Sequence, residues 1–208
     1  CCSGDIVIIL KRSPVMQNIP VFLSSDNNYA PFVAVTIASI CDNTKKIIDF
    51  FILDSGIKKV NKEKILNLKN RFKNFKINYV DIDTDKNFIP KKYTNNSYIT
   101  LATYSRLLIP LLKPDLKKVL YVDADTLILN DISDLYNIEL ENYALGAAWN
   151  PKRGLYNTDT KEPLELSDSH KYFNAGVLLI DIQKWIKDDV VNSLFEIQKK
   201  YDGKILHA

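Results

Sequence analysis

Apolar and polar positions in the first part of the chain follow a pattern of alternating strands and helices. Three short runs are expected to be strands: residues 19–24, which are apolar and typical of a buried strand, and residues 47–53 and 76–82. A helix with Pro31 in its first turn separates the first two runs, and it is apolar on nearly every side, which predicts that it is buried. A second helix, capped at Asn61, carries apolar residues at helical spacing between lysines: Ile65, Leu68 and Phe72. This order predicts parallel strands with right-handed crossovers, that is, an α/β fold with a Rossmann-like, mostly parallel sheet flanked by helices.

The pattern continues beyond residue 100 with longer polar interruptions. We expect a helix over 100–112, strands over 119–122, 143–149 and 173–181, a short turn or helix over 131–135, and a helix over 182–201. Two polar segments are expected to be loops: residues 88–97 and 151–169. The second is long enough for a functional lid or a disordered connection.

Composition and length narrow the class of protein. The 208 residues suffice for one domain with a sizeable core, and a net charge of +3 does not argue for a nucleic-acid partner. No stretch approaches the roughly 20 apolar residues that a membrane span needs. The only methionine is Met16, so residues 1–18 are interpreted as a tail or a read-through segment and residues 19–208 as the folded domain.

The cysteines and histidines do not form a recognisable site. Cys1, Cys2 and Cys41 fit no zinc spacing. Cys41 lies near the end of an apolar helix and is expected to be a buried, reduced thiol, which favours a cytoplasmic compartment. His170 and His207 lie apart from other ligand residues, which favours surface or loop positions.

Two aspartates provide the main candidate chemistry. Asp123 and Asp125 follow the apolar strand over 119–122, and alternate residues of an extended chain point to one side. Two adjacent carboxylates repel each other and call for a cation, and hard divalent ions prefer oxygen ligands that they share with phosphates. The sequence therefore predicts a metal site that handles a diphosphate; the alternative is a turn whose carboxylates cap the next element.

Other polar residues fall near the ends of predicted strands. Asp26, Asn28 and Tyr29 follow the first strand, where they can contact a nucleoside or merely cap the helix. Arg106 lies in an otherwise apolar helix and requires an anionic partner, either a diphosphate or a structural carboxylate. Asn174 and Gly176 open a buried strand, where Gly176 allows a ligand to approach closely or simply forms a turn.

A basic segment leads up to the third predicted strand. Between Lys58 and Lys76 there are eight lysines or arginines and one acidic residue, Glu63. A solvated helix face is the ordinary interpretation. The alternative is contact with anionic lipid headgroups, which predicts a peripheral association with the inner face of a membrane.

Four stretches together resemble one known family. They are residues 21–30, 103–107, 119–126 and 172–180, followed by Trp185 at the usual interval. In this order they resemble glycosyltransferase family 8, the bacterial lipopolysaccharide galactosyl- and glucosyltransferase type that is related to glycogenin. The resemblance implies that residues 19–208 are a GT-A nucleotide-sugar-binding catalytic domain. It also implies a UDP-galactose or UDP-glucose donor, Mn²⁺ or Mg²⁺, and a glycan or glycolipid acceptor.

The resemblance also implies roles for individual positions. The implied uridine contacts are Ser24, Asp26, Asn28 and Tyr29. The implied metal ligands are Asp123 and Asp125, with the Ala124 backbone near the ribose. Arg106 is implied to lie beside the donor sugar and diphosphate, and the implied lining of the sugar pocket is Asn150, Asn174, Ala175 and Gly176. Catalytic roles are thereby expected for Arg106, Asn150 and Asn174.

The function expected from these motifs is a metal-dependent, retaining transfer of a hexose to an acceptor hydroxyl, in lipopolysaccharide or other surface glycan synthesis. The family continues after a segment like 206–208 with Asp-Gln-Asp and later a metal-binding histidine, so we expect a C-terminally truncated member. An inactive UDP-sugar-binding module therefore remains an alternative. A nucleotidyltransferase is a further one, although residues 24–28 lack the glycines of a phosphate loop.

Overall fold

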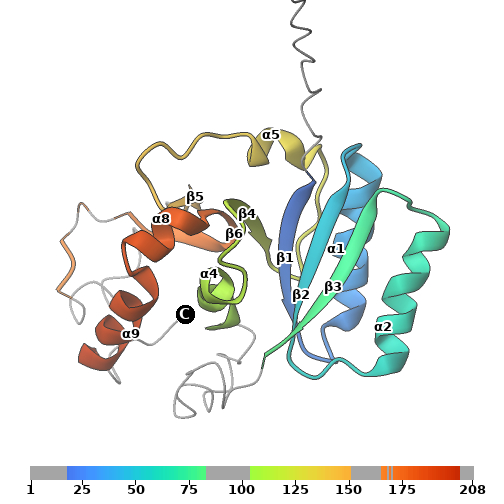
Figure 1. Ribbon diagram of the computed structural model, residues 1–208, viewed down its shortest axis with the longest axis horizontal. Coiled ribbons are helices and arrows are strands. Elements are labelled where there is room, and N and C mark those ends of the chain that lie inside the picture. Colours follow the sequence, from blue (N-terminus) through green and yellow to red (C-terminus); the bar gives the residue numbers. More distant parts are fainter. Residues whose placement is uncertain (1–17, 83–103, 151–164, 168, 170, 202–208) are drawn as a thin grey trace, which may run out of the picture.

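One mixed sheet organises the computed structural model, which describes residues 18–82, 104–150, 165–167, 169 and 171–201. Within these residues six strands pair in the order β3-β2-β1-β4-β6-β5 (Figure 1). They are β1 Ile19–Ser25, β2 Ile48–Asp54, β3 Phe75–Asp81, β4 Lys118–Val122, β5 Leu145–Trp149 and β6 Phe173–Asp181. The predicted α/β fold with a mostly parallel sheet is confirmed, because β3, β2, β1 and β4 are parallel. The strand β6 runs antiparallel to both β4 and β5.

Helices cover both faces of the sheet. They are α1 Ala30–Asn43, α2 Lys59–Leu66, the 3₁₀ turn η1 Asn67–Asn70, the 3₁₀ turn η3 Arg106–Leu108, α4 Ile109–Leu112, α5 Ile132–Tyr136, α8 Ile182–Lys187 and α9 Val190–Lys200. Figure 1 shows α1 and α2 side by side along β1 to β3, whereas α4, α8 and α9 gather near β4 and β6.

The strands divide their side chains between two apolar cores. On β1, Val21 and Leu23 join the core beneath α1 and α2, while Phe22 joins the core beneath α4 and α8. On β4, Leu120 faces the first core and Tyr121 the second. This alternation follows from the two-residue period of a strand, and it explains why these runs are apolar throughout rather than at every other position.

Several predicted helices differ from the observed ones. The helix α1 is not buried on all sides, because Phe32 and Val35 are 53% and 57% exposed. The helix α2 begins at Lys59, so Asn61 lies inside it and does not cap it. The predicted helix over 100–112 is also divided in its described part, because α4 begins anew at Ile109 with Pro110 in its first turn, where a missing N–H costs little.

The predicted helix over 182–201 is two helices. The helix α8 ends at Lys187, and Asp189 takes the left-handed conformation (φ 49°) before α9 begins at Val190. This bend brings Val191, which is 7% exposed, onto the second core, whereas Ile186 and Ile197 face solvent.

Cys41 is a free thiol that is 5% exposed, and burial raises its pKa to about 12. The prediction of a buried, reduced thiol is therefore confirmed. The predictions for residues 1–17, 88–97 and 151–164, and for His170 and His207, fall outside the described residues. In the part of the chain that is described, none of the helices has both the length and the apolar character needed to cross a membrane.

Candidate functional site

The order in which the chain adds strands to the sheet reverses between β1 and β4. From β1 the chain builds outward through β2 and β3, and it then returns to place β4 on the other side of β1. The register pairs Val21 with Leu120 and Phe22 with Tyr121, so the carboxyl ends of β1 and β4 lie at the same edge. Open α/β sheets bind ligands at such a switch point, outside the carboxyl ends of the strands.

Asp123 lies directly after β4 and is held from several directions. Its Oδ1 accepts a hydrogen bond from the Tyr121 hydroxyl (2.8 Å) and lies 3.0 Å from Nη2 of Arg106. Burial raises the pKa of Tyr121 well above its usual range, and the Asp123 charge adds to that shift while Arg106 opposes it. Tyr121 therefore remains a hydrogen-bond donor at neutral pH, and it fixes one oxygen of the Asp123 carboxylate.

Arg106 connects the end of β4 to the beginning of β6. Its Nη1 donates to the Ala175 carbonyl (2.6 Å), and its guanidinium lies 4.6 Å from the centre of the Tyr121 ring. The Asp123 backbone N–H donates to the Gly176 carbonyl (2.7 Å) in the same place. The carboxylate partner that the sequence required for Arg106 is therefore Asp123.

Gly176 leaves space beside the other oxygen of Asp123. A Cβ at position 176 would lie 2.9 Å from Asp123 Oδ2 and 2.9 Å from Asn174 Oδ1. The Asn174 oxygen accepts a hydrogen bond from the Gly176 N–H (2.7 Å). Any side chain larger than glycine would therefore fill the approach to Asp123, so the need for glycine here is one of space.

Asp125 is placed differently from the prediction. The strand β4 ends at Val122, and Ala124 and Asp125 form a turn that Thr126 N closes onto the Asp123 carbonyl (3.2 Å). The extended geometry expected for both aspartates is therefore wrong at Asp125, whose side chain is exposed in a turn.

The residues present fit a divalent cation that is completed by a ligand. Asp123 Oδ2 borders the space at Gly176, and Asp125 is exposed beside it along the chain. No third histidine, cysteine or acidic residue joins them within the described ranges. Mg²⁺ commonly binds through one or two carboxylates together with substrate phosphates, so two aspartates are a sufficient protein contribution.

The residues after β1 are largely engaged in holding the loop. The carboxylate oxygen Oδ1 of Asp26 accepts hydrogen bonds from the N–H groups of Asn28 (2.8 Å) and Tyr29 (2.9 Å). This oxygen of Asp26 therefore caps the turn that leads into α1, in line with the alternative role expected from the sequence. Ser24 is buried, and its hydroxyl shares a hydrogen bond of 2.7 Å with the Ser105 hydroxyl, which ties the residue before Arg106 to β1. The side chains of Asn28 and Tyr29 are exposed.

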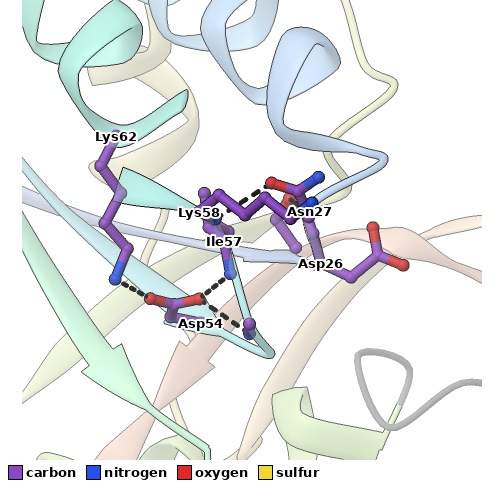
Figure 2. Close-up of polar contacts among 8 residues, drawn as sticks. Asp26, Asn27, Asp54, Ile57, Lys58 and Lys62 are labelled. Carbon is purple, nitrogen blue, oxygen red and sulfur yellow. Dashed lines mark hydrogen bonds and ion pairs between the residues drawn. The ribbon is translucent and has the colours of Figure 1, made fainter. Parts of the chain in front are cut away.

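A second turn braces this loop from the side of β2. Figure 2 shows Asn27 beside Lys58, whose N–H donates to the Asn27 Oδ1 (3.0 Å). The same figure shows Asp54 at the end of β2, where Oδ1 accepts from the N–H groups of Gly56 and Ile57 and Oδ2 pairs with Lys62. The two loops at this edge are thus fixed to each other.

The two asparagines expected at the sugar lie on neighbouring strands. Asn174 is the register partner of Ala148, next to a bulge between Ala147 and Ala148. The Asn150 N–H donates to the Tyr172 carbonyl (2.8 Å), which continues this pairing beyond β5. Asn150 and Asn174 are therefore at the same edge of the sheet as Asp123.

Sequence reasoning missed three residues that shape the site: Ser105, Tyr121 and Thr36, whose hydroxyl donates to the Ala124 and Thr126 carbonyls. The role of Tyr121 could have been predicted, because a side chain two positions before Asp123 in a strand lies on the same side as Asp123. Thr36 could have been noticed as a polar residue in an apolar helix. Nothing in the sequence indicated that Ser105 would bond to Ser24.

Comparison with solved structures defines the class of protein. The chain superposes on galactosyltransferase LgtC, solved in complex with donor and acceptor sugar analogues, with a TM-score of 0.78 and 29% identity. The match covers 91% of this chain and 67% of that one. The domain therefore has the GT-A glycosyltransferase fold that the sequence motifs implied.

The family follows from the sequence. The model of glycosyl transferase family 8 matches residues 20–207, and the chain belongs to this family. It is 35% identical over 188 residues to a protein of Haemophilus influenzae named as a glycosyltransferase, covering 90% of this chain and 56% of that protein. It is 30% identical over 185 residues to the lipopolysaccharide 1,2-glucosyltransferase of Escherichia coli, covering 86% and 52%. The chain thus spans about half the length of these relatives.

Proposed function

We propose that this glycosyltransferase moves a hexose, galactose or glucose, from a UDP-sugar to an acceptor hydroxyl with retention of configuration. The observation that carries the proposal is the Asp123 carboxylate at the switch point. One of its oxygens is bound by Tyr121 and Arg106, and the other borders the space at Gly176. An oriented carboxylate with an approachable oxygen suits a cation-bound diphosphate.

The residues of the site have complementary tasks in this proposal. Asp123 and Asp125 hold Mn²⁺ or Mg²⁺, which when bound stabilises the negative charge of the departing UDP. Arg106, fixed by Asp123 and the Ala175 carbonyl, adds positive charge on the same side. Asn150 and Asn174 orient the sugar. In line with the resemblance to family 8, we infer attack by the acceptor on the face that UDP leaves, without a covalent intermediate on the protein.

The nucleotide end of the donor lies at the loop after β1 in this proposal. Asn28 and Tyr29 are exposed there, and a half-exposed tyrosine ring can stack on a base. Ser24 and Ala124 contribute through their backbones, because the Ser24 hydroxyl is bonded to Ser105 and Ala124 has only a methyl group. Asp26 keeps one oxygen beyond its cap for the uridine.

The acceptor is proposed to be a glycan or a glycolipid of lipopolysaccharide or another surface polymer. The similarity to a lipopolysaccharide 1,2-glucosyltransferase supports this class of acceptor. Lipid-linked acceptors are found at membranes, so we also propose a cytoplasmic protein that contacts the inner membrane face through the basic segment 58–76. Lys58, Lys59 and Lys64 are exposed on and beside α2.

The test is an Asp125→Ala variant of the whole natural protein, assayed for UDP release with UDP-galactose and UDP-glucose and Mn²⁺. We expect a loss of about 100-fold or more, as for other groups that stabilise transition-state charge. Asp134→Ala is the matched control, because Asp134 is an exposed aspartate in α5 that lies outside the site. Near wild-type turnover by Asp125→Ala would rule out the proposed metal site. Binding of UDP and Mn²⁺ by the wild-type protein without any turnover would favour the inactive binding module instead.

A further inference from the structure

The segment that follows β4 is fastened to one side of α1. Thr36 Oγ1 lies 2.7 Å from the Ala124 carbonyl and 2.9 Å from the Thr126 carbonyl. Further along, Ser39 Oγ accepts from Ile128 N (3.1 Å), Asn43 Nδ2 donates to Ile128 O (3.0 Å), and Thr44 Oγ1 accepts from Ile132 N (3.2 Å). Polar side chains spaced along the helix thus hold consecutive parts of the segment from Ala124 to Ile132.

Thr36 differs from the other three because its two acceptors flank Asp125. The turn from Asp123 to Thr126 is closed by its own backbone hydrogen bond, and the Thr36 hydroxyl reaches its second and fourth carbonyls. One hydroxyl proton is therefore shared across the turn. The carbonyl groups of the residues before and after Asp125 are therefore held against α1, while the Asp125 side chain is exposed on the turn.

Thr36 lies in a largely apolar part of α1. Thr36 is 1% exposed, and Val33, Ile37 and Ile40 of the same helix have no exposed surface. Valine has almost the same shape as threonine and would satisfy this core at lower cost, because a buried hydroxyl must be paired. The hydroxyl is therefore explained by what it bonds to and not by packing.

We propose that Thr36 is a positioning residue for the metal site, and that its hydroxyl sets the turn which carries Asp123 and Asp125. The inference rests on the proposed function, since it concerns the same cation. A carboxylate on a loosely held turn must be ordered when the metal binds, and that ordering weakens binding. Groups that orient metal ligands from behind change metal affinity about 10- to 100-fold when they are removed.

The experiment compares Thr36→Val, Thr36→Ser and Thr44→Val in the whole protein. Thr36→Val removes the hydroxyl and keeps the shape, Thr36→Ser keeps the hydroxyl, and Thr44→Val removes a hydroxyl that holds the segment farther away, at Ile132. Dissociation constants for Mn²⁺ are measured by the electron paramagnetic resonance signal of the free ion, and thermal unfolding is measured alongside. Thr36→Ala, which removes the same hydroxyl without a valine methyl, replaces Thr36→Val if that variant does not fold.

Thr36→Val is expected to weaken Mn²⁺ binding about 10-fold or more, Thr36→Ser to restore it to within a few-fold, and Thr44→Val to leave it unchanged although it lowers the melting temperature. In steady state the concentration of Mn²⁺ required for half-maximal rate rises in Thr36→Val. Mn²⁺ binding by Thr36→Val that equals wild type, or that falls no further than in Thr44→Val, would overturn the role of Thr36 alone. Absence of Mn²⁺ binding by the wild-type protein would overturn the proposed metal site and this inference together.

Discussion

The two oxygens of Asp123 have separate environments, and this division is the main residue-level feature of the site. Oδ1 is bound by Tyr121 and Arg106, whereas Oδ2 faces the position where Gly176 lacks a side chain. The contacts of Oδ1 fix the plane of the carboxylate. Oδ2 is therefore oriented toward the open space, where it can bind a cation. A carboxylate oriented before the ligand arrives loses little entropy on binding.

Gly176→Ala tests this division directly. The added Cβ would stand 2.9 Å from Asp123 Oδ2 and Asn174 Oδ1, so both side-chain oxygens must move away. We expect Mn²⁺ affinity and turnover to fall about tenfold or more, because the carboxylate loses its orientation. The free energy of unfolding should change by only about 1–2 kcal/mol, since exposed and half-buried atoms can shift. The measurements are Mn²⁺ titration, UDP release and urea unfolding on the same preparations.

Gly146→Ala is the control for adding a methyl group to this sheet. Its Cβ also meets an atom at 2.9 Å, but that atom is the terminal Cδ2 of Leu140, which can rotate away. Metal affinity and turnover should therefore remain at the wild-type level. Equal losses in both alanine variants would mean that the space at Gly176 has no special connection to the site.

Much of the site at this scale was predictable from the sequence. Arg106, Asp123, Ala175 and Gly176 lie together as the motif order implied, because each motif ends or begins a neighbouring strand or turn. The conformation of the turn at Asp125 was not predictable. It depends on the Thr36 hydroxyl, which is 88 residues from Ala124 in the chain.

At the scale of elements, the turn between β2 and α2 places an acidic residue at the same edge as the site. The Asp54 side chain is 8% exposed, accepts from Gly56 N (3.0 Å) and Ile57 N (2.7 Å), and pairs with Lys62. Gly56 takes a left-handed conformation (φ 102°), which the turn requires and which favours glycine. Both carboxylate oxygens of Asp54 are therefore engaged in structural contacts, so we assign this residue to structure and not to the metal.

Asp54→Ala and Asp54→Asn distinguish the contribution of the two backbone hydrogen bonds from that of the ion pair with Lys62. Alanine removes both backbone acceptors and the ion pair, and it should lower the free energy of unfolding by about 2–3 kcal/mol. Asparagine keeps an oxygen for the two N–H groups and should cost about 1 kcal/mol. Urea unfolding measures both, and Mn²⁺ affinity should be unchanged in the asparagine variant.

Lys59→Met provides the control on α2. Lys59 is 92% exposed and its nitrogen lies 4.0 Å from Glu63, so the loss of this surface pair should change stability by less than about 0.5 kcal/mol. If Asp54→Asn instead abolished Mn²⁺ binding while leaving stability intact, Asp54 would belong to the metal site.

The elements that the sequence predicted well are those with a strong local pattern. All six strands were expected within a few residues. The apolar runs of β1 and β4 are buried as expected, whereas β3 and β5 are mostly exposed or half-buried. The break between α8 and α9 was missed, since a single left-handed residue, Asp189, interrupts a pattern that is otherwise helical throughout. The apolar surface of Phe32 and Val35 was misassigned because their exposure depends on which faces of α1 the sheet and α2 cover.

At the scale of the whole molecule, charge is unevenly distributed. The segment 58–76 carries eight basic residues and one acidic residue. Part of this charge is neutralised, because Lys62 pairs with Asp54 and Arg71 lies 3.4 Å from Asp42. Lys58, Lys59 and Lys64 remain exposed around α2, at the opposite side of the molecule from α8 and α9 in Figure 1. A surface of this kind attracts anionic headgroups without any apolar insertion, and the attraction weakens with salt.

Replacement of Lys58, Lys59 and Lys64 by glutamine should abolish most of the proposed membrane contact. Each lysine near an anionic surface contributes about 1 kcal/mol, so the triple variant should bind vesicles that contain phosphatidylglycerol about 100-fold more weakly at low salt. The matched control replaces Lys117, Lys187 and Lys199, which are also exposed, so that the same charge is removed elsewhere. Co-sedimentation of the whole protein with neutral and anionic vesicles is the measurement. Equal binding to neutral vesicles, or an equal loss of binding in the control, would show that α2 does not face the membrane. UDP release should be unchanged in both triple variants, because the replaced lysines lie on the surface and not at the site.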